Sequence, residues 1–413
     1  MDENALNTSP YAPLKITEFR NFVTGRFLFI MALRMTGTVI SWWIYELTNS
    51  PFALGLVGLS EVITAVSLAL YAGHYIDKNE KRNILLTCLL FYMGCMVAFI
   101  FLSSGISPIK APWHIAMLIF TVIAITGAIR AFSGPTFHAI IAQIVPKAML
   151  PRAAAINSSS WLIGSVLGHA LAGFLIATID VHLSFYVILA FALTGFLLLT
   201  TLKPKKVFAT THQNTWQSVK EGVSYVFKTK EILSTLSLDL FAVLFGGAIA
   251  MVPVFAKDIL HVGAVGFGWL NAATDIGSII TVTALTLFPL KRNQGMWMLL
   301  SVAGFGACII LFAVSKVFWL SFAALVISGC MDGVSVIVRS TIIQLNTPDE
   351  LRGRVMSVNS MFINSSNELG QFESGIAAKL MGVVPSVIFG GCMTIGVVIF
   401  NWIKVPSLKK MEY

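Results

Sequence analysis

Charged residues are scarce in this chain of 413 residues: only 11% are Asp, Glu, Lys or Arg, whereas 56% are hydrophobic. A soluble domain carries roughly 25% charged residues, so this composition cannot cover a surface that faces water. It excludes a soluble protein and predicts a membrane protein that crosses the bilayer many times.

Cysteine and catalytic motifs are also sparse. The five cysteines lie inside apolar stretches, and none has the spacing to another Cys or His that is typical of a disulfide framework or a zinc site. Neither a GxSxG nor an HExxH motif occurs in the sequence. The sequence therefore predicts no metal site, no cofactor and no enzymatic activity.

The sequence contains a duplication. The segment from Gly127 to Gly173 recurs 202 positions later, from Gly329 to Gly375. Apolar identities arise easily in membrane segments, but matches at Gly, Pro, Arg and Asn are informative because these residues have specific roles in turns and loops. Such matches pair Gly127 with Gly329, Pro146 with Pro348, Arg152 with Arg354, Asn157 with Asn359, Gly168 with Gly370, and Gly173 with Gly375. Since the offset is about half the chain, we expect two equivalent halves.

The apolar runs predict twelve membrane-spanning helices. A span needs about 20 mainly apolar residues, and its backbone groups must bond within the segment, which selects a helix. The first six expected spans cover residues 21–46, 53–76, 83–104, 113–141, 153–178 and 182–202, and the second six cover 231–256, 264–289, 295–314, 317–345, 355–380 and 384–404. The expected fold is an all-α polytopic membrane protein with two pseudo-equivalent six-helix bundles. Its expected domains are residues 1–202, a cytoplasmic amphipathic linker at 203–230, and residues 231–413.

The positive charges are distributed unevenly about these spans. If the N-terminus lies inside, 21 of the 28 Lys and Arg residues fall on that side, four on the opposite side and three within spans. This asymmetry follows the positive-inside rule and predicts that both termini are cytoplasmic in an inner (cytoplasmic) membrane. It also accounts for the net charge of +9, so we expect no nucleic-acid partner.

Two short motifs resemble those of the major facilitator superfamily. The loop after the second expected span has Gly73, Asp77 and Arg82 at the spacing of the superfamily's loop signature. In the fourth expected span, Arg130 precedes a Gly-Pro pair as in the superfamily's arginine-bearing motif. The resemblance implies the major facilitator fold, and it implies that Gly73, Asp77 and Arg82 act in a conformational gate.

A third motif resembles the glycine-rich motif of the superfamily's antiporter branch. It contains Gly164, Gly168 and Gly173 in the fifth expected span. Small residues at these intervals allow helices to approach closely, so the three glycines are further gate candidates. The chain departs from the motif at His169, where the family has Pro, and at Ala172, where it has Gly. These departures put the antiporter assignment and the proline kink in question.

The resemblance extends over nearly the whole chain. The segments FRNFVTGRF, LTNSPFALGLVGL and TPDELRGRVMSVN, the last containing the gate candidate Arg354, look like the bacterial drug- and siderophore-exporter branch of the superfamily. That resemblance implies export of a bulky amphiphilic small molecule, driven by protons, and a role in drug resistance. The implied protein is a monomer whose partners are its substrate, protons and membrane lipid.

Ionisable residues inside spans are costly and usually face an interior cavity. Nine candidates stand out: Arg34, Glu61, Arg130, Asp239, Asp275, Asp332, Arg339, Glu368 and Glu373. The candidates for substrate binding or proton coupling are Arg34, Glu61, Arg130, Asp275, Asp332 and Glu368. Asp239 and Arg339 are also interpretable as residues at the cytoplasmic edge of the membrane, and Glu373 as a packing residue near the outer edge. His169 is interpreted as a hydrogen-bonded packing residue. Because Arg130 and Asp332 are equivalent at the 202-residue offset, we expect them to pair across a central cavity.

The leading hypothesis is a secondary active transporter that works by alternating access, with a binding site near the bilayer midplane. Three alternatives remain open. The chain could transport lysolipids or other lipids, it could export a metal ion, or it could be a membrane sensor that transports nothing.

Overall fold

The computed structural model describes residues 9, 11–106, 110–205, 215–405 and 409; within these ranges the side chains of residues 70, 215–219, 349 and 350 are not described. The secondary structure in the described part of the chain is helical throughout, without strands. The elements of the first half are η1 (Ala12–Lys15), α2 (Thr17–Thr48), α3 (Pro51–Lys78), α4 (Lys81–Ser103), α5 (Pro112–Ile144), η2 (Lys147–Met149) and α6 (Leu150–Thr200). They are followed by α7 (Thr215–Lys228), α8 (Lys230–Phe245), η3 (Ala248–Met251), α9 (Val252–Val254), η4 (Phe255–Ile259), α10 (Gly263–Leu287), α11 (Gln294–Val314), α12 (Phe318–Leu345), α13 (Asp349–Met381) and α14 (Val383–Lys404).

The predicted all-α membrane fold is confirmed. Ten helices in the described ranges are long and apolar enough to cross a membrane. One of these, Lys147–Thr200, has 54 residues, which is enough for two crossings. Helix α13 is too polar to be among the ten, but its 33 residues are long enough for a span. These helices therefore supply the twelve spans that the apolar runs predict.

The duplication is visible in the backbone. Pro146 (φ −58°, ψ 148°) and its counterpart Pro348 (φ −56°, ψ 148°) each precede the first turn of a helix. Beyond the end of this repeat but at the same 202-residue offset, Asp180 (φ 72°, ψ 177°) and Gly382 (φ 91°, ψ 160°) adopt a conformation that residues other than glycine rarely accept. Asp180 divides α6 into its two spans, and its carboxylate accepts a hydrogen bond from the Leu183 amide at 2.9 Å, which caps the second of them.

By their contacts the residues form two compact units. Unit 1 comprises residues 1–40 and 63–211, and unit 2 comprises residues 41–62 and 212–413. The end of α2 and the first part of α3 therefore pack with the second half of the chain. The division of the sequence at residues 202 and 231 into two transmembrane bundles stays a prediction.

In unit 1, α4 packs against α5 and α6. Helix α6 also approaches α2 closely at two levels. A Cβ on Gly168 would lie 2.8 Å from the Cβ of Arg34, and a Cβ on Gly195 would lie 2.9 Å from the Gly25 carbonyl oxygen. Small residues thus bring α2 and α6 together, which places the middle of α2 against the first span of α6.

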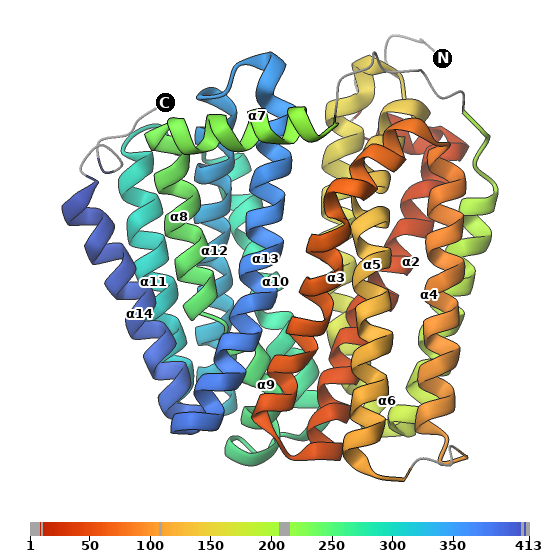
Figure 1. Ribbon diagram of the computed structural model, residues 1–413, viewed down its shortest axis with the longest axis vertical. Helices are drawn as coiled ribbons and strands as arrows, with labels where there is room; N and C mark the ends of the chain where they lie inside the picture. Colours follow the sequence, from red (N-terminus) through yellow and green to blue (C-terminus); the bar gives the residue numbers. More distant parts are fainter. Residues whose placement is uncertain (1–8, 10, 107–109, 206–214, 406–408, 410–413) are drawn as a thin grey trace. The chain divides into compact units, whose positions relative to one another are not determined.

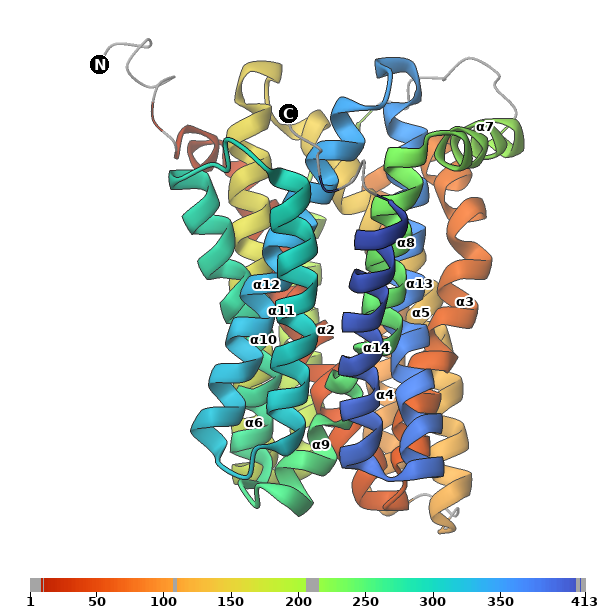
Figure 2. The same cartoon turned by 90° about the vertical axis from the view of Figure 1, so that its left-hand side faces the viewer.

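In unit 2, α12 packs against α10 and α11, and α8 packs against α13 and α14 (Figures 1 and 2). The run from Lys230 to Ile259 is one candidate membrane span, but it is not one helix. Helix α8 ends at Phe245, Gly246 and Gly247 follow, and the chain continues as short 3₁₀, α and π turns. Helices broken inside a membrane place backbone dipole ends at the depth where transporters bind their ligands.

Helix α7, in the linker between the halves, lies across the ends of α8 and α13 (Figure 1). Val226 is fully buried there in a cluster that includes Ile232 and Val355. The Tyr225 hydroxyl donates a hydrogen bond to the Asn346 carbonyl at 2.6 Å. Part of the apolar face of α7 is therefore packed against other helices of unit 2. Residues 206–214 of the predicted amphipathic linker lie outside the described residues, as do the side chains of Trp216 and Val219.

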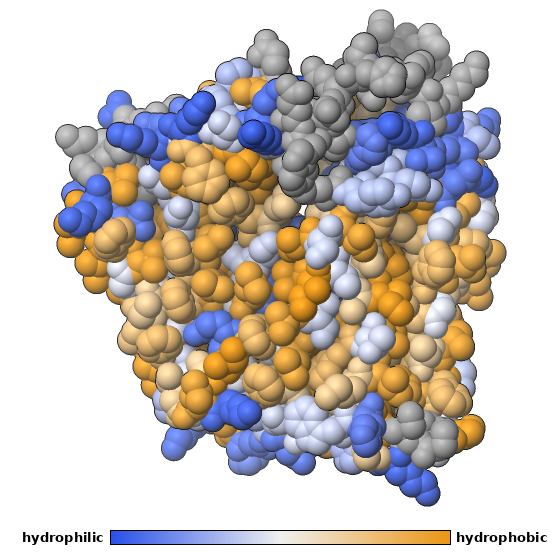
Figure 3. All heavy atoms as spheres, viewed as in Figure 1, coloured by the Kyte–Doolittle hydropathy of each residue, from blue (hydrophilic) through white to orange (hydrophobic). Residues whose placement is uncertain are grey.

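The surface of the protein is divided into polar and apolar regions. On the face that Figure 3 shows, apolar side chains cover the flanks of the helices and hydrophilic side chains gather at their two ends. Exposed apolar residues of the membrane-spanning helices include Leu90, Phe91, Phe174, Leu197, Phe400 and Ile403. Such a belt is stable only in contact with lipid, which agrees with a multi-pass membrane protein.

Candidate functional site

Among the polar residues that the structure describes in the membrane-spanning helices, four groups contain candidates from the sequence: one in unit 1 and three in unit 2. The group in unit 1 centres on Arg34 of α2 and is called the Arg34 cluster. Its members are Arg34, Thr38, Trp161 and His169. The guanidinium carbon of Arg34 lies 4.9 Å from the centroid of the Trp161 ring on α6. One turn further along α2, the Thr38 hydroxyl and His169 Nδ1 are 2.6 Å apart.

This cluster exists because the two helices touch. Gly168 allows the backbone of α6 to meet α2 at Arg34, and the same contact brings the neighbouring His169 to Thr38. Arg34 is a candidate from the sequence, and the interpretation of His169 as a hydrogen-bonded packing residue is consistent with its contact to Thr38. The sequence does not predict the contact of Arg34 with Trp161, although both residues lie in apolar segments and have side chains that carry polar atoms. The guanidinium lies over an aromatic face, where cations are attracted.

The second group, called the acidic pocket, lies between α8, α11 and α12 in unit 2. Its lining includes Asp239, Asp332 and Ser335. Arg339 forms an ion pair with Asp239, and the exposed fractions of these side chains are only 2% and 9%. The interpretation of Asp239 and Arg339 as edge residues that reach toward water is therefore wrong: the pair is closed inside the unit.

Asp332 stands beside this ion pair on the same helix as Arg339, seven residues away. Within the described residues, its carboxylate makes no hydrogen bond and no ion pair. The pocket and the adjoining ion pair together contain two carboxylates and one guanidinium. Since Arg339 balances the charge of Asp239, the remaining charge of the group depends on whether Asp332 holds a proton.

The third group, called the α3–α13 seam, joins the first part of α3 to α13 within unit 2. A Cβ on Gly58 would lie 2.7 Å from the Glu368 carbonyl oxygen, and a Cβ on Gly55 would lie 2.9 Å from the Gly375 Cα. Gln371 lies in the same seam and donates a hydrogen bond from its side chain to Glu368 at 2.9 Å. Glu368 is therefore a buried carboxylate at a helix contact that only glycine allows.

Two aromatic and polar contacts continue the same join. The Tyr45 hydroxyl donates a hydrogen bond to Asp258, and the Lys257 ammonium lies 5.5 Å from the centroid of the Tyr45 ring. The rings of Trp42 and Phe267 are 5.4 Å apart. These contacts tie the end of α2 to η4 and α10. None of them is predicted from the sequence, because residues more than 200 positions apart carry no local signal of pairing.

The fourth group is a hollow around Glu373, lined by residues of α8, α13 and α14. Apolar side chains make up the rest of its wall. It therefore differs in character from the acidic pocket, where charged groups face one another.

Three further ionisable candidates lie on α3, α10 and α5. Glu61 on α3 and Asp275 on α10 are half-buried, and Arg130 on α5 is exposed; each of the three has a polar or electrostatic interaction. Arg130 belongs to unit 1 and Asp332 to unit 2. Their pairing stays a prediction.

Some of the gate candidates lie in open surroundings, and others contact a neighbouring helix. A Cβ on Gly73 would meet no atom within 4 Å, and Asp77 is exposed near the end of α3. Arg82 donates a hydrogen bond to the Thr200 carbonyl at 2.8 Å, at the C-terminal end of α6, where a positive charge is favoured by the helix dipole. Gly164 lies against α2, and a Cβ added there would be 3.2 Å from the Phe27 ring.

Two more gate candidates, Gly173 and Arg354, lie in the described part of the chain. Gly173 is buried in α6. Arg354, at the start of α13, forms an ion pair with Glu221 of α7. Its equivalent in the repeat, Arg152, is half-buried near the start of α6. The arginine of the second half thus fastens the linker helix to unit 2.

No group of three or more His, Cys, Asp or Glu residues that could hold a metal ion occurs in the described part of the chain. The polar groups of the spans are instead an arginine on an aromatic face, a carboxylate beside an ion pair, a glycine seam and an apolar hollow with one carboxylate. Together with the apolar belt, these groups define a helical membrane protein with polar sites buried in its spans.

Comparison with known proteins agrees with this assignment as a helical membrane protein. The family model of the Major Facilitator Superfamily matches residues 22–371. The chain therefore belongs to the major facilitator superfamily, and it is a multi-pass membrane transporter of that family.

Relatives of known sequence match over nearly their full length. The enterobactin exporter EntS of Shigella boydii serotype 4 (strain Sb227) is 23% identical over 391 residues, which cover 92% of this chain and 90% of the relative. The MFS-type transporter YkuC of Bacillus subtilis (strain 168) is 23% identical over 432 residues, which cover 95% of this chain and 94% of the relative.

Solved structures match in fold. The D-xylose-proton symporter superimposes with a TM-score of 0.72 at 16% identity, over 96% of this chain and 99% of that chain. The nucleoside transporter NupG gives the same TM-score of 0.72 at 13% identity, over 96% of this chain and 100% of that chain. At these identities the likeness shows the fold alone, and it confirms the predicted major facilitator fold of two pseudo-equivalent helical bundles.

Proposed function

We propose that this transporter exports a bulky amphiphilic small molecule, a siderophore or a drug, in exchange for protons. The observation that carries the proposal is the acidic pocket, where Asp332 lies beside the Asp239–Arg339 ion pair without a partner among the described residues. A carboxylate inside a membrane protein that lacks a fixed partner is suited to bind and release a proton.

The chemistry of the pocket gives Asp332 a defined task. With Asp332 protonated, the group of two acids and one arginine has no net charge, and the pocket can be closed to water at low cost. With Asp332 ionised, the same closure buries an unbalanced negative charge, which costs several kcal/mol. Release of the proton therefore favours the state in which the pocket is open to water, and binding of the proton favours the closed state.

The seam between α3 and α13 supplies the moving part of the proposal. Alternating access requires contacts that form in one state and break in the other. The contacts of residues 41–62 with η4, α10 and α13 join a segment of the first half of the chain to the second half. We infer that these contacts close one face of the transporter, and that they separate when the binding site opens to that face.

The nature of the cargo is supported by the relatives and by the Arg34 cluster. EntS exports enterobactin according to its name, and an arginine on a tryptophan face offers both a positive charge and an aromatic surface to an acidic aromatic substrate. The orientation, with both termini in the cytoplasm, is supported by the distribution of Lys and Arg. The transporter works as a monomer in this proposal.

The test is uptake into inverted membrane vesicles that contain the overproduced protein. Radiolabelled enterobactin and erythromycin serve as probes, and an imposed pH gradient serves as the driving force. We expect uptake of at least one probe that stops when an ionophore collapses the gradient. Uptake that continues unchanged without the gradient would refute proton coupling, and uptake of neither probe would refute the cargo class.

A variant separates coupling from binding. Asp332→Asn should abolish uptake against a concentration gradient and retain exchange of labelled for unlabelled substrate, because exchange needs no net proton movement. Glu46→Gln, which changes an exposed carboxylate on α2, is the matched control and should behave as the wild type.

A further inference from the structure

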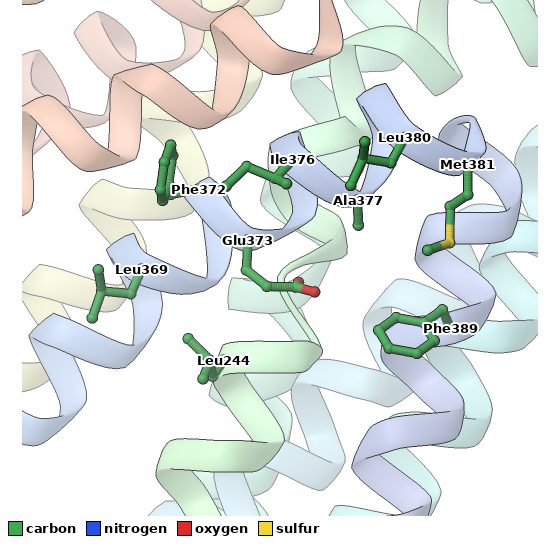
Figure 4. Close-up of a pocket in the computed structure, with 9 residues that line it drawn as sticks. All are labelled: Leu244, Leu369, Phe372, Glu373, Ile376, Ala377, Leu380, Met381 and Phe389. Atoms are coloured by element: carbon green, nitrogen blue, oxygen red, sulfur yellow. The ribbon is translucent and has the colours of Figure 1, made fainter.

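The hollow around Glu373 lies on the flank of unit 2, apart from the polar groups that the proposed function uses. It has a volume of about 410 Å³ and is lined by residues of α8, α13 and α14 (Figure 4). Eight of its nine lining residues are hydrophobic, and the ninth is Glu373. Pockets of drug-sized ligands have volumes of about 300–1,000 Å³, so the space suits a small organic molecule.

The hollow opens on the surface of unit 2. Leu380 and Met381 at its rim are 77% and 45% exposed, and Phe389 on α14 is 38% exposed. Figure 4 shows the Glu373 side chain directed away from α13 into the space between Leu244 and Phe389. A carboxylate thus faces an apolar hollow whose rim is exposed on the surface of unit 2.

The depth of this carboxylate is set by the helix. Glu373 lies eight residues before Met381, the last residue of α13, and at 1.5 Å per residue this is about 12 Å from the helix end. Half of the hydrocarbon core measures about 15 Å. An amphiphilic molecule dissolved in the membrane reaches this depth.

The charge of the hollow selects the ligand. No Lys or Arg in the described part of the chain pairs with Glu373. The basic residue nearest along α13, Lys379, lies with its ammonium 4.6 Å from the centroid of the Phe52 ring. In addition, α8 ends at Phe245, directly after the lining residue Leu244, and the C-terminal end of a helix carries a partial negative charge. Both features favour a cation.

We propose that this hollow is a binding site for an amphiphilic organic cation that enters from the membrane. The cation rests against Glu373, and its apolar body fills the space between Leu244, Ile376 and Phe389. This site is separate from the acidic pocket, and its occupation does not depend on whether the protein exports its cargo in exchange for protons.

The experiment measures binding of rhodamine 6G, a cationic amphiphilic dye, to the purified full-length protein in nanodiscs by fluorescence anisotropy. Empty nanodiscs correct for dye that dissolves in lipid, and Nile red, an uncharged lipophilic dye, reports binding that needs no charge. We expect saturable binding of rhodamine 6G to the wild type. Glu373→Gln should weaken that binding at least tenfold and leave the binding of Nile red unchanged.

Two further variants locate the bound dye. Ile376→Lys places an ammonium one turn from Glu373, on a residue that is 36% exposed, and it should compete with the dye as strongly as removal of the carboxylate. Asp332→Asn removes the carboxylate of the acidic pocket and should leave dye binding unchanged.

Three results would overturn the proposal: no saturable binding of rhodamine 6G to the wild type, equal binding by wild type and Glu373→Gln, or loss of binding in Asp332→Asn with retention in Glu373→Gln. An equal loss of both dyes in Glu373→Gln would show a collapsed hollow rather than a charge-selective site, and it also counts against the proposal. Because binding is measured without transport, the result of this experiment does not depend on whether the proposed transport function is correct.

Discussion

Replacing Gly58 by alanine tests whether the α3–α13 seam opens during transport. The added Cβ would lie 2.7 Å from the Glu368 carbonyl oxygen and 2.8 Å from the Gln371 Cβ, closer than such atoms can approach. The first of these neighbours is backbone, so the two helices must move apart. Overpacking of this kind costs about 1–3 kcal/mol, and the cost falls only on the state in which the seam is closed.

The expected consequence is a shift of populations. Since about 1.4 kcal/mol corresponds to a factor of ten, a cost of about 2 kcal/mol raises the ratio of open to closed seam about 30-fold. Spin labels at Asn49, between α2 and α3, and at Lys379, near the end of α13, report the separation of the two helices by pulsed electron resonance. We expect one short distance in the wild type, and a second, longer distance of substantial population in Gly58→Ala.

The control is Gly94→Ala on α4. Gly94 is exposed, and a Cβ there would meet no atom within 4 Å, so this change should leave the distance distribution as in the wild type. If the seam were a permanent structural contact, Gly58→Ala would lower the melting temperature without a second distance. That outcome, or a distribution identical to that of the control, would refute the idea that the seam is a moving contact.

Three further predictions follow from the polar contacts. Arg339→Leu should destabilise the protein by about 3–5 kcal/mol because it leaves the Asp239 carboxylate buried without its partner. The double variant Arg339→Leu with Asp239→Asn should recover much of the melting temperature. Equal melting temperatures of the single and the double variant would contradict the pairing. Tyr225→Phe removes one hydrogen bond of α7 and should cost about 0.5–1.5 kcal/mol, seen as faster amide exchange in α7 alone; unchanged exchange would show that the contact contributes nothing. Trp161→Leu removes the aromatic face under Arg34 and should weaken binding of an acidic aromatic substrate severalfold. The control variant Trp319→Leu, at an exposed position on α12, should not change this binding. Equal effects of the two changes would argue against the Arg34 cluster as a substrate site.

The helices could be predicted well from the sequence, because an apolar run of about 20 residues bounded by Gly, Pro or charge has few other solutions in a membrane. The duplication was equally clear, and the backbone repeats it at Pro146 and Pro348 and again at Asp180 and Gly382. The break after Phe245 was not predicted, since the apolar run continues through Gly246 without a change of composition.

The candidate sites were predicted less completely. The ionisable residues within spans could be found from composition alone, but their partners could not. Asp239 and Arg339 lie 100 positions apart, and their depth near one edge of the membrane suggested contact with water rather than with each other. The Thr38–His169 contact and the hollow at Glu373 depend on how helices cross, and a single sequence carries no signal of crossing. Composition finds the costly residues; only the packing shows what each one faces.

The most direct test of proton-coupled export is substrate-driven proton movement in liposomes that contain the purified transporter. A pH-sensitive dye inside the liposomes records protons while enterobactin or erythromycin is added outside. We expect a proton flux opposite to that of the substrate in the wild type, and no flux in Asp332→Asn, although that variant still exchanges substrate. Transport of substrate by the wild type without any movement of protons would contradict the proposed coupling.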